Sequence, residues 1–288
     1  MLAFIITCVL ATIPHLANAE FECYVPRDII SEIVPLHQVA ESHLSTMNNL
    51  ELDEDWKLND FFGVIQVIND ASSVKKLESI ASELESVGVY DYEIFPAVAG
   101  FSLDPLIQTK CEGQSPVEAG RYMTHYRLLK QVKRKFEQAV LDYYTAQVKH
   151  DEKGIKKAKA NLHQNRSVLI LKDTIGFGTN KSTGTKGLGR VLRETLRGLP
   201  ENWDIVYFYA TTYQPTEIIS SLIERINKSY FDVAYAVNYR MYGPLCHHLK
   251  KIEEPTIPDV RHIDHQISHI HKDFNVYLMR VPMVYLKD

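Results

Sequence analysis

The sequence predicts an α/β protein with a mainly parallel sheet flanked by helices. Short apolar runs of strand length, rich in β-branched and aromatic residues, recur along the chain. Stretches with apolar residues three and four positions apart, the period of an amphipathic helix, separate these runs. Strands that alternate with helices in this way indicate parallel pairing within one sheet.

The first strand–helix–strand unit spans residues 61–98. Phe61–Ile68 is an apolar run that predicts a buried strand. The apolar positions between Val74 and Val87 predict a helix, and Gly88 stands where a helix end favours a left-handed residue. Glu93–Val98 predicts the second strand, which we expect to pair in parallel with the first through a right-handed crossover.

A long helical segment follows, from Glu118 to His163. Apolar residues recur in it at spacings of three and four, with charged and amide side chains between them. We expect Gly154 to interrupt the segment, so that Ile155–His163 forms a short basic helix of its own.

The second half of the chain continues the alternation. Ser167–Thr174 predicts a strand that ends on a charged pair, Lys172 and Asp173. Residues 176–189 predict a polar loop before a helix that ends near Arg197, and Thr216–Ile226 predicts an amphipathic helix. The remaining predicted strands are Trp203–Tyr209, Phe231–Val237, Val276–Met279 and Met283–Leu286.

Length and charge limit the class of protein. The 288 residues are enough for one large domain with a substantial core. A formal net charge of -4 disfavours a general nucleic-acid binder, which shows a basic face. We assign the domain to residues 61–288, behind a polar and acidic leader at residues 20–60.

The N-terminus predicts export. Leu2–Ile13 is an uncharged apolar run that is too short to span a bilayer, and the small-x-small pattern Ala17–Ala19 precedes Glu20. These features predict a cleaved signal peptide at residues 1–19. The alternative is a buried N-terminal strand or helix. Cleavage would place the chain in a periplasm, in the ER lumen or outside the cell, with no stable membrane span.

Three cysteines remain after such a cleavage: Cys23, Cys111 and Cys246. An odd number cannot be fully paired within one chain, and no two have the spacing of a metal knuckle. The three cysteines could form one disulfide and leave one thiol, or they could all be buried thiols, and the sequence does not choose between these states.

The chain contains partial matches to two known site motifs, a phosphate-binding loop and a zinc-protease helix, and each lacks a required residue. Asn180 stands where a phosphate-binding loop needs glycine before Lys-Ser. His265 and His269 have the spacing of a zinc-protease helix, but Gln266 replaces its glutamate, so we expect surface or hydrogen-bonded histidines. The acids at the edges of predicted elements are expected to be caps or surface groups: Asp173, Asp204, Asp232 and Asp264.

Seven segments of the chain, taken in order, match those of one known family. Two of them are Phe95-Pro-Ala-Val-Ala-Gly100, and Glu118-Ala-Gly120 followed by His125. The others are Val67-Ile-Asn69, Val168-Leu-Ile-Leu171, Trp203-Asp-Ile-Val206, Ala234-Tyr-Ala-Val237 and Ile263-Asp-His-Gln-Ile267. Over residues 61–288 the chain resembles glycosyltransferase family 25, which contains lipooligosaccharide glycosyltransferases and collagen galactosyltransferases.

The resemblance implies a GT-A-like, Rossmann-like scaffold and a definite chemistry. A hexose such as galactose would pass from a UDP-sugar to a glycan or protein acceptor. A Mn²⁺ or Mg²⁺ ion held by carboxylates would neutralise the leaving diphosphate, and a further carboxylate would deprotonate the acceptor hydroxyl.

The family motifs also suggest roles for individual residues. Asp264 and Glu118 are the expected catalytic acids, although Glu118 and His125 also suit a purely architectural role. Asp173 is the expected metal ligand. The expected donor-binding residues are Asn69, Lys172, Asp173 and His125.

Two departures from the family pattern bear on activity. Family members carry Glu-Asp-Asp after the Leu-Ile-Leu strand, where this chain has Lys172-Asp173-Thr174. They carry basic residues after Ile-Asn-Leu, where this chain has Asp70-Ala-Ser-Ser73. Either Lys172 neutralises the diphosphate in place of a metal ion, or catalysis has been lost. In the second case the chain would be a secreted module that binds a glycan or a protein.

Overall fold

The computed structural model describes residues 57–69, 74–105, 107, 115–178, 188–212, 214–230, 233–253 and 262–287. The expected signal peptide at residues 1–19 lies outside these ranges, as do Cys23 and Cys111. Of the expected leader, only residues 57–60 are described, and they lead into the short helix α4 (Leu58–Phe61). No helix in these ranges combines the length and the apolar character that crossing a membrane requires.

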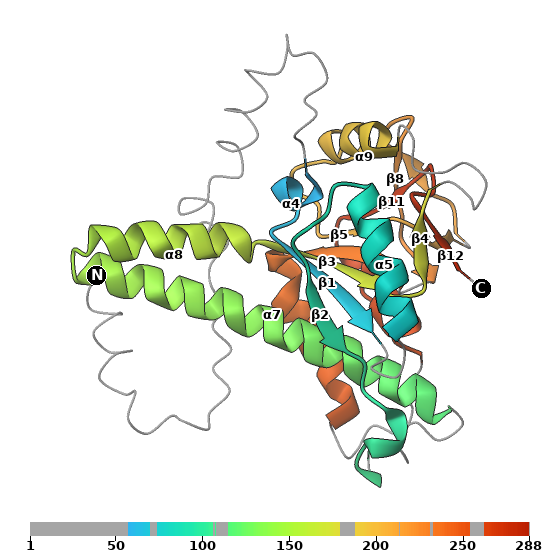
Figure 1. The fold of residues 1–288 in the computed structure, drawn as a ribbon, viewed down its shortest axis with the longest axis horizontal. Coiled ribbons are helices and arrows are strands. Elements are labelled where there is room, and N and C mark those ends of the chain that lie inside the picture. The colour runs from blue at the N-terminus through green and yellow to red at the C-terminus, as the bar shows by residue number, and fades with distance from the viewer. Residues whose placement is uncertain are drawn as a thin grey trace.

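The fold is α/β, with a mixed, mostly parallel central sheet flanked by helices (Figure 1). The eight strands lie in the order β2-β1-β3-β10-β5-β11-β8-β7. Their bounds are β1 (Val64–Asn69), β2 (Glu93–Pro96), β3 (Ser167–Lys172), β5 (Ile205–Tyr207), β7 (Glu217–Ile218), β8 (Ile223–Arg225), β10 (Ala234–Asn238) and β11 (Val276–Met279). The predicted parallel pairing of the first two strands is confirmed, with Gln66 opposite Glu93.

One strand in the middle of the sheet runs against its neighbours. β10 pairs antiparallel with both β3 and β5, whereas β11 pairs in parallel with β5. β1, β2, β3, β5 and β11 therefore run in one direction, and their carboxyl ends lie at one edge of the sheet. We call this edge the carboxyl edge.

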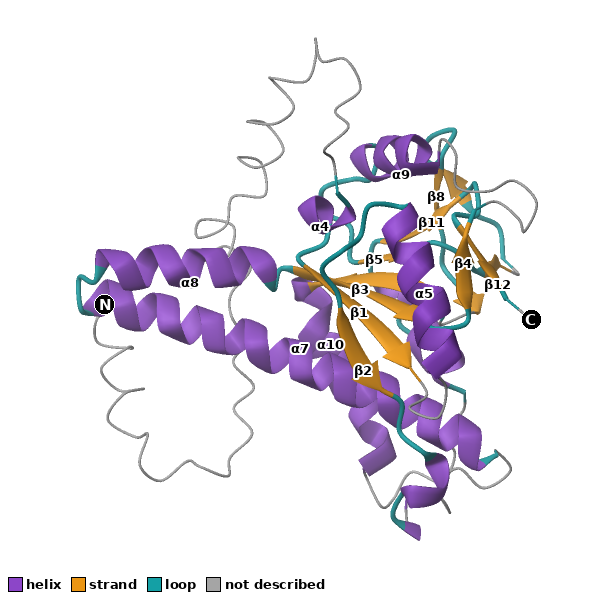
Figure 2. Cartoon of the chain, viewed as in Figure 1, coloured by secondary structure: helices purple, strands orange, loops and turns teal. Residues whose placement is uncertain are grey.

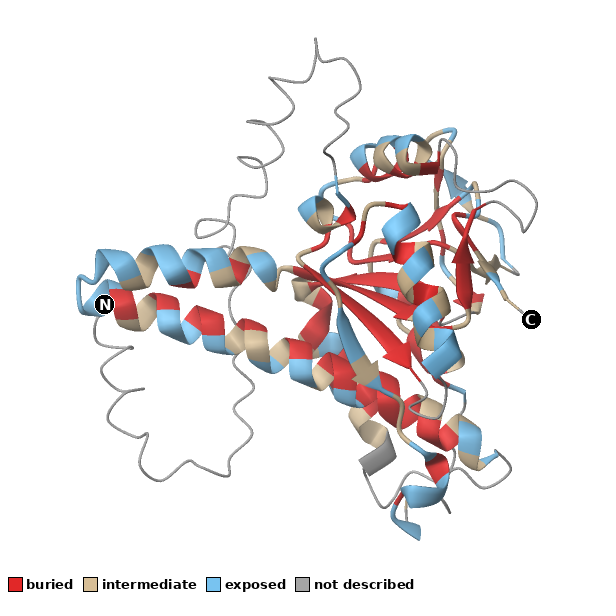
Figure 3. Cartoon of the chain, in the orientation of Figure 1, coloured by how far each residue is buried: buried red, intermediate tan, exposed pale blue. Residues whose placement is uncertain are grey.

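Helices cover both faces of the sheet because strand side chains alternate between two separate cores. Ile65 and Leu169 belong to the core that includes α5 (Val74–Ser86) and α9 (Leu188–Arg197). Val64 and Val168 belong to the other core, which includes α7 (Pro116–Val148). The remaining helices of that second face are α8 (Glu152–Gln164), α10 (Tyr242–Leu249) and α11 (Ile263–Ser268). Figures 2 and 3 show the helices around the sheet and the buried strands between them.

The long helical segment forms a hairpin that extends away from the sheet (Figure 1). The expected interruption at Gly154 is wrong, because the chain turns at His150, whose φ of 52° is left-handed. Asp151 then caps α8 by accepting a hydrogen bond from the Gly154 amide at 3.0 Å. Gly154 therefore lies inside the second helix. The break between the two helices is set by the capping acid, Asp151.

The predicted helix at Thr216–Ile226 is also wrong, since β7 and β8 form a hairpin there. The Ser220 hydroxyl accepts hydrogen bonds from the amides of Leu222 and Ile223, which builds a local turn in competition with a helix. β8 then pairs with β11, and this long-range contact overrides the helical spacing of the apolar residues.

The expected polar loop at residues 176–189 begins as a strand instead. β4 (Ile175–Phe177) pairs with the C-terminal strand β12 (Val284–Leu286). Lys287 reinforces this pairing by forming an ion pair with Glu83 on α5 at 2.8 Å. The C-terminal end of the chain thus joins the turn after β3 to the helix after β1.

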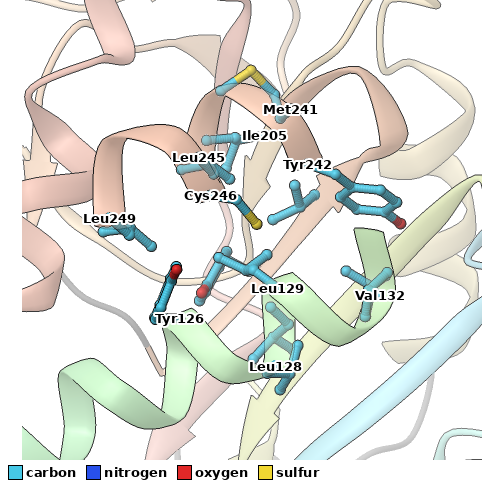
Figure 4. Close-up of a cluster of buried hydrophobic side chains, with 14 of the residues drawn as sticks. Tyr126, Leu128, Leu129, Val132, Ile205, Met241, Tyr242, Leu245, Cys246 and Leu249 are labelled. Atoms are coloured by element: carbon cyan, nitrogen blue, oxygen red, sulfur yellow. The ribbon is translucent and has the colours of Figure 1, made fainter. Parts of the chain in front are cut away.

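Cys246 is a residue of α10 whose side chain lies in the core toward α7, close to Leu129 and Leu245 (Figure 4). It is a free thiol, and burial raises its pKa to about 12. Cys23 and Cys111 lie outside the described ranges, so a disulfide between them and two further thiols both stay open. Cys246 itself is protonated and unreactive at neutral pH.

The start of α7 packs against the turn that follows β2 through backbone contact. A Cβ atom at Gly120 would lie 2.3 Å from the Val98 carbonyl oxygen and 2.7 Å from the Gly100 amide nitrogen. A Cβ at Gly100 would lie 1.5 Å from the Pro116 carbonyl oxygen. The Thr124 hydroxyl also accepts a hydrogen bond from the Val98 amide at 2.8 Å. Glycine is therefore required at both positions.

We expect Gly120→Ala to lower the free energy of unfolding by at least about 1–3 kcal/mol, because the added methyl meets rigid backbone atoms. Gly189→Ala is the matched control. It also lies near the start of a helix, but its Cβ would meet nothing within 4 Å. The control should leave stability unchanged or raise it by up to about 1 kcal/mol. Urea denaturation measures both, and equal effects would contradict the contact.

Candidate functional site

The sheet topology places a candidate site at the carboxyl ends of β1 and β3. The chain passes from β1 outward to β2 and then returns to β3 on the other side of β1. The two connections pack on opposite faces, α5 on one and α7 with α8 on the other. Ligands of open α/β sheets bind outside the carboxyl ends of the strands at such a switch point.

Asn69 and Asp173 meet at this switch point. The Asn69 side-chain amide donates a hydrogen bond of 2.9 Å to the Asp173 carboxylate, and both side chains are buried. The Asp173 amide donates to the Ile68 carbonyl at 3.1 Å, and the Asn69 carbonyl accepts from the Ala97 amide at 2.9 Å. The structure therefore brings together two of the predicted donor-binding residues, 104 positions apart in the sequence.

Lys172, the third predicted donor-binding residue at this point, is the last residue of β3. It lies opposite Ile68 of β1, and its amide donates to the Val233 carbonyl at 2.9 Å. Its side chain is partly buried. The bond to the Val233 carbonyl, and the bond from the next residue, Asp173, to the Ile68 carbonyl, hold the end of β3 that carries Lys172.

Glu118, a predicted catalytic acid, joins two helices. Its carboxylate lies 3.0 Å from His262 Nδ1, directly before α11, and 3.4 Å from Arg121 on its own helix. Burial would raise the pKa of Glu118, but the hydrogen bond from His262 and the charge of Arg121 outweigh it and hold the pKa below its usual range. Glu118 is therefore a stable anion and a weak base, suited to positioning α11.

Asp264, the other predicted catalytic acid, lies in the first turn of α11. One of its oxygens accepts a hydrogen bond from the His265 amide at 2.8 Å, and the residue is partly exposed. The neighbouring His265 ring packs on Tyr230 of β9 (Ser229–Tyr230), with ring centroids 4.4 Å apart. Tyr230 precedes Val233, the backbone partner of Lys172, by three residues.

His125, another predicted donor-binding residue, makes contacts with β10 inside the core. Its side chain is fully buried on α7, and Nδ1 lies 2.8 Å from the Tyr235 hydroxyl on β10. Tyr235 stacks on Tyr207 of β5, whose hydroxyl lies 3.1 Å from Nε2 of His271. The structure thus places His125 in a chain of polar aromatic side chains inside the core.

A metal site does not form from the residues that the structure describes. Within these ranges no three His, Cys, Asp or Glu side chains are grouped to hold an ion. His265 contacts Tyr230, whereas the His269 ring faces His248 with centroids 6.4 Å apart. Asp70 and Asp232, which follow β1 and precede β10 in sequence, lie outside the described ranges.

Two features of the site region were not anticipated from sequence. Arg121 and His262 hold Glu118, and Tyr230 packs on His265. The sequence does give one signal for the contact between Glu118 and Arg121, which is their i, i+3 spacing on a predicted helix.

Asp204 was expected to be a cap or a surface acid. It is buried instead, and it forms a partly buried ion pair with Arg240 at 3.0 Å. It lies at the other end of β5, away from the carboxyl edge.

The chain matches no family model, and no curated protein matches it. The case for a function therefore depends on the residues and the geometry described above.

His271 should make the fold sensitive to acid. Burial lowers its pKa from 6.5 to about 3, so the folded state keeps it neutral while the unfolded state takes up a proton below pH 6.5. Stability is therefore lost as the pH falls from 6.5 to about 3, by at most roughly 5 kcal/mol.

Denaturant unfolding of His271→Gln across this pH range tests the assignment, since glutamine keeps a partner for Tyr207 without titrating. We expect a shallower loss of stability in this variant than in the unchanged chain. His150→Asn, at an exposed position, is the control and should leave the pH profile as it was. Parallel profiles for all three proteins would contradict the role of His271.

Proposed function

We propose that this protein is a glycosyltransferase of family 25 type on a GT-A-like scaffold. It would transfer a hexose such as galactose from a UDP-sugar to a glycan or a protein side chain. The observation that carries the proposal is the Asn69–Asp173 hydrogen bond at the switch point. It joins the ends of two segments that resemble the family, Val67-Ile-Asn69 and Val168-Leu-Ile-Leu171.

A second contact supports the same proposal. Phe95–Gly100 and Glu118–Gly120 are two of the segments that resemble the family, and they touch each other through Gly100 and Gly120. Residues of these two motifs are thus required for one structural contact, which explains why they would occur together. The mixed sheet with helices on both faces is compatible with a GT-A-like scaffold.

The proposed reaction assigns a task to each residue group. Asn69, Lys172 and Asp173 bind the donor at the carboxyl edge. The bond between hexose C1 and the diphosphate oxygen breaks, and its electron pair leaves with the nucleoside diphosphate. The acceptor oxygen bonds to C1 while its proton passes to the Asp264 carboxylate. Glu118 keeps α11, and with it Asp264, against α7 through His262.

A second candidate function follows from the acids at this edge. Asp173 is the only acid of its motif and is already bonded to Asn69. A chain that has lost catalysis would keep the fold and bind a glycan or a protein partner. In either case the proposed location is the secretory pathway or another exported compartment.

Titration calorimetry of the full chain with UDP-galactose and UDP-glucose tests the donor site. We expect Asp173→Ala to weaken binding by at least roughly tenfold, or about 1.4 kcal/mol, because the donor loses a contact and Asn69 loses its partner. Asp142→Ala, an exposed acid on α7, should bind like the unchanged chain. Absence of heat with every UDP-hexose would refute the transferase and favour the binding module.

The proposed base has its own test. Asp264→Asn should lower kcat by about 10²–10⁴-fold while leaving donor affinity unchanged, since an amide cannot accept the acceptor proton. Release of UDP in the presence of a sugar acceptor measures the rate. Glu118→Gln should have a smaller effect, because it alters the position of α11 without removing the base. A loss with Glu118→Gln that exceeds that of Asp264→Asn would reverse the two assignments.

A further inference from the structure

We infer that Tyr207 and His271 are positioning residues for the proposed base, Asp264. Their hydrogen bond attaches the C-terminal end of α11 to the central sheet, while the contact between Glu118 and His262 attaches its start to α7. Their catalytic role rests on the function proposed above, whereas the attachment itself can be measured without a substrate.

His271 lies shortly after α11 and is fully buried in the short helix η5 (His271–Asp273). Its Nε2 atom lies 3.1 Å from the Tyr207 hydroxyl, and the two rings meet edge to face with centroids 5.5 Å apart. Among the described residues its other ring nitrogen, Nδ1, has no hydrogen-bond partner. The Ile270 amide donates to the Ile267 carbonyl at 3.3 Å, so the segment between α11 and His271 continues the helix. A displacement of His271 would therefore be passed on to α11.

Tyr207 offers His271 a fixed partner in the middle of the sheet. It is the last residue of β5 and lies opposite Tyr235 of β10 on one side and Leu278 of β11 on the other. The Tyr235 ring stacks on it with centroids 5.8 Å apart, and the Tyr235 hydroxyl lies 2.8 Å from Nδ1 of His125 on α7. The same chain of aromatic side chains thus connects the end of α11 to the sheet and to α7.

Apolar packing by itself would not fix the orientation of α11. The helix has six residues, and Ile263 and Ile267 bury one side of it in the core that includes α7. Burial of apolar surface is non-directional, so it holds the helix against the core without determining its rotation. Hydrogen bonds require defined distances and angles. The two contacts, one directly before the helix and one shortly after it, therefore determine the orientation of α11 and of Asp264.

Amide hydrogen exchange of the full chain, followed by mass spectrometry without a ligand, tests the attachment. We expect Tyr207→Phe to speed exchange in residues 263–273 by at least roughly fivefold, because the His271 ring loses a buried hydrogen bond. Tyr242→Phe is the matched control, since its buried hydroxyl donates to the Asn165 carbonyl at 3.1 Å, away from α11. It should leave residues 263–273 unchanged.

Two results of the exchange experiment would overturn the inference. One is unchanged exchange in residues 263–273 of Tyr207→Phe. The other is an equal increase in α5 and α9, which would indicate a general loss of stability and no specific hold on α11.

The UDP-release assay with UDP-galactose as donor tests the catalytic consequence. We expect Tyr207→Phe to lower kcat by roughly 10- to 100-fold, because a small displacement of the base is enough, and to leave donor affinity unchanged. His271→Leu should act in the same way. His271→Gln can still bond to Tyr207 and should keep most of the activity. An unchanged kcat in Tyr207→Phe, or an equal loss in His271→Leu and His271→Gln, would overturn the positioning role.

The positioning role and the transferase function can fail separately. If the unchanged chain binds neither UDP-galactose nor UDP-glucose, the transferase proposal is refuted, and hydrogen exchange alone decides whether Tyr207 and His271 hold α11. If the unchanged chain is active and Tyr207→Phe matches it in both exchange and kcat, only the positioning role is refuted.

Discussion

The backbone contact between the start of α7 and the turn after β2 is the constraint on which the site region depends. At Gly120 and Gly100 the two segments approach so closely that no side chain fits between them. This contact places the first turn of α7 at the carboxyl edge of the sheet. Glu118 lies in that turn, and through His262 it holds α11 and Asp264. A methyl group added at either glycine would push the start of α7 away from the turn, and Glu118 would move with the helix.

The second constraint is the return of the chain from β2 to β3 across β1. It brings Asn69 and Asp173 together at a switch point and orders the polar groups of that edge around them. Many of the edge's charges are paired: Asp173 with an amide, and Glu118 with Arg121 and His262. Lys172 directly precedes Asp173 in the chain, and its amide donates a hydrogen bond to the Val233 carbonyl.

Elements with a strong local signal were predictable, and those that depend on a distant partner were not. The buried strands β1, β3, β5, β10 and β11 and the helices α5, α7 and α9 coincide with apolar runs or periodic stretches of the sequence. The hairpin of β7 and β8 has helical spacing and becomes a strand pair because β11 offers an edge. The turn at His150 depends on the Asp151 cap, which outweighs the expected effect of Gly154.

By itself the sequence determined the α/β class, the parallel first unit and the presence of a charged strand end at Lys172 and Asp173. These properties follow from residue spacing along the chain, which local physics controls. Only the tertiary structure decided which polar residues share a site. It joined Asp173 to Asn69 and placed His125 in the core beside Tyr235. Such pairings depend on strand order and helix packing, because residues more than a hundred positions apart meet only when the sheet has formed.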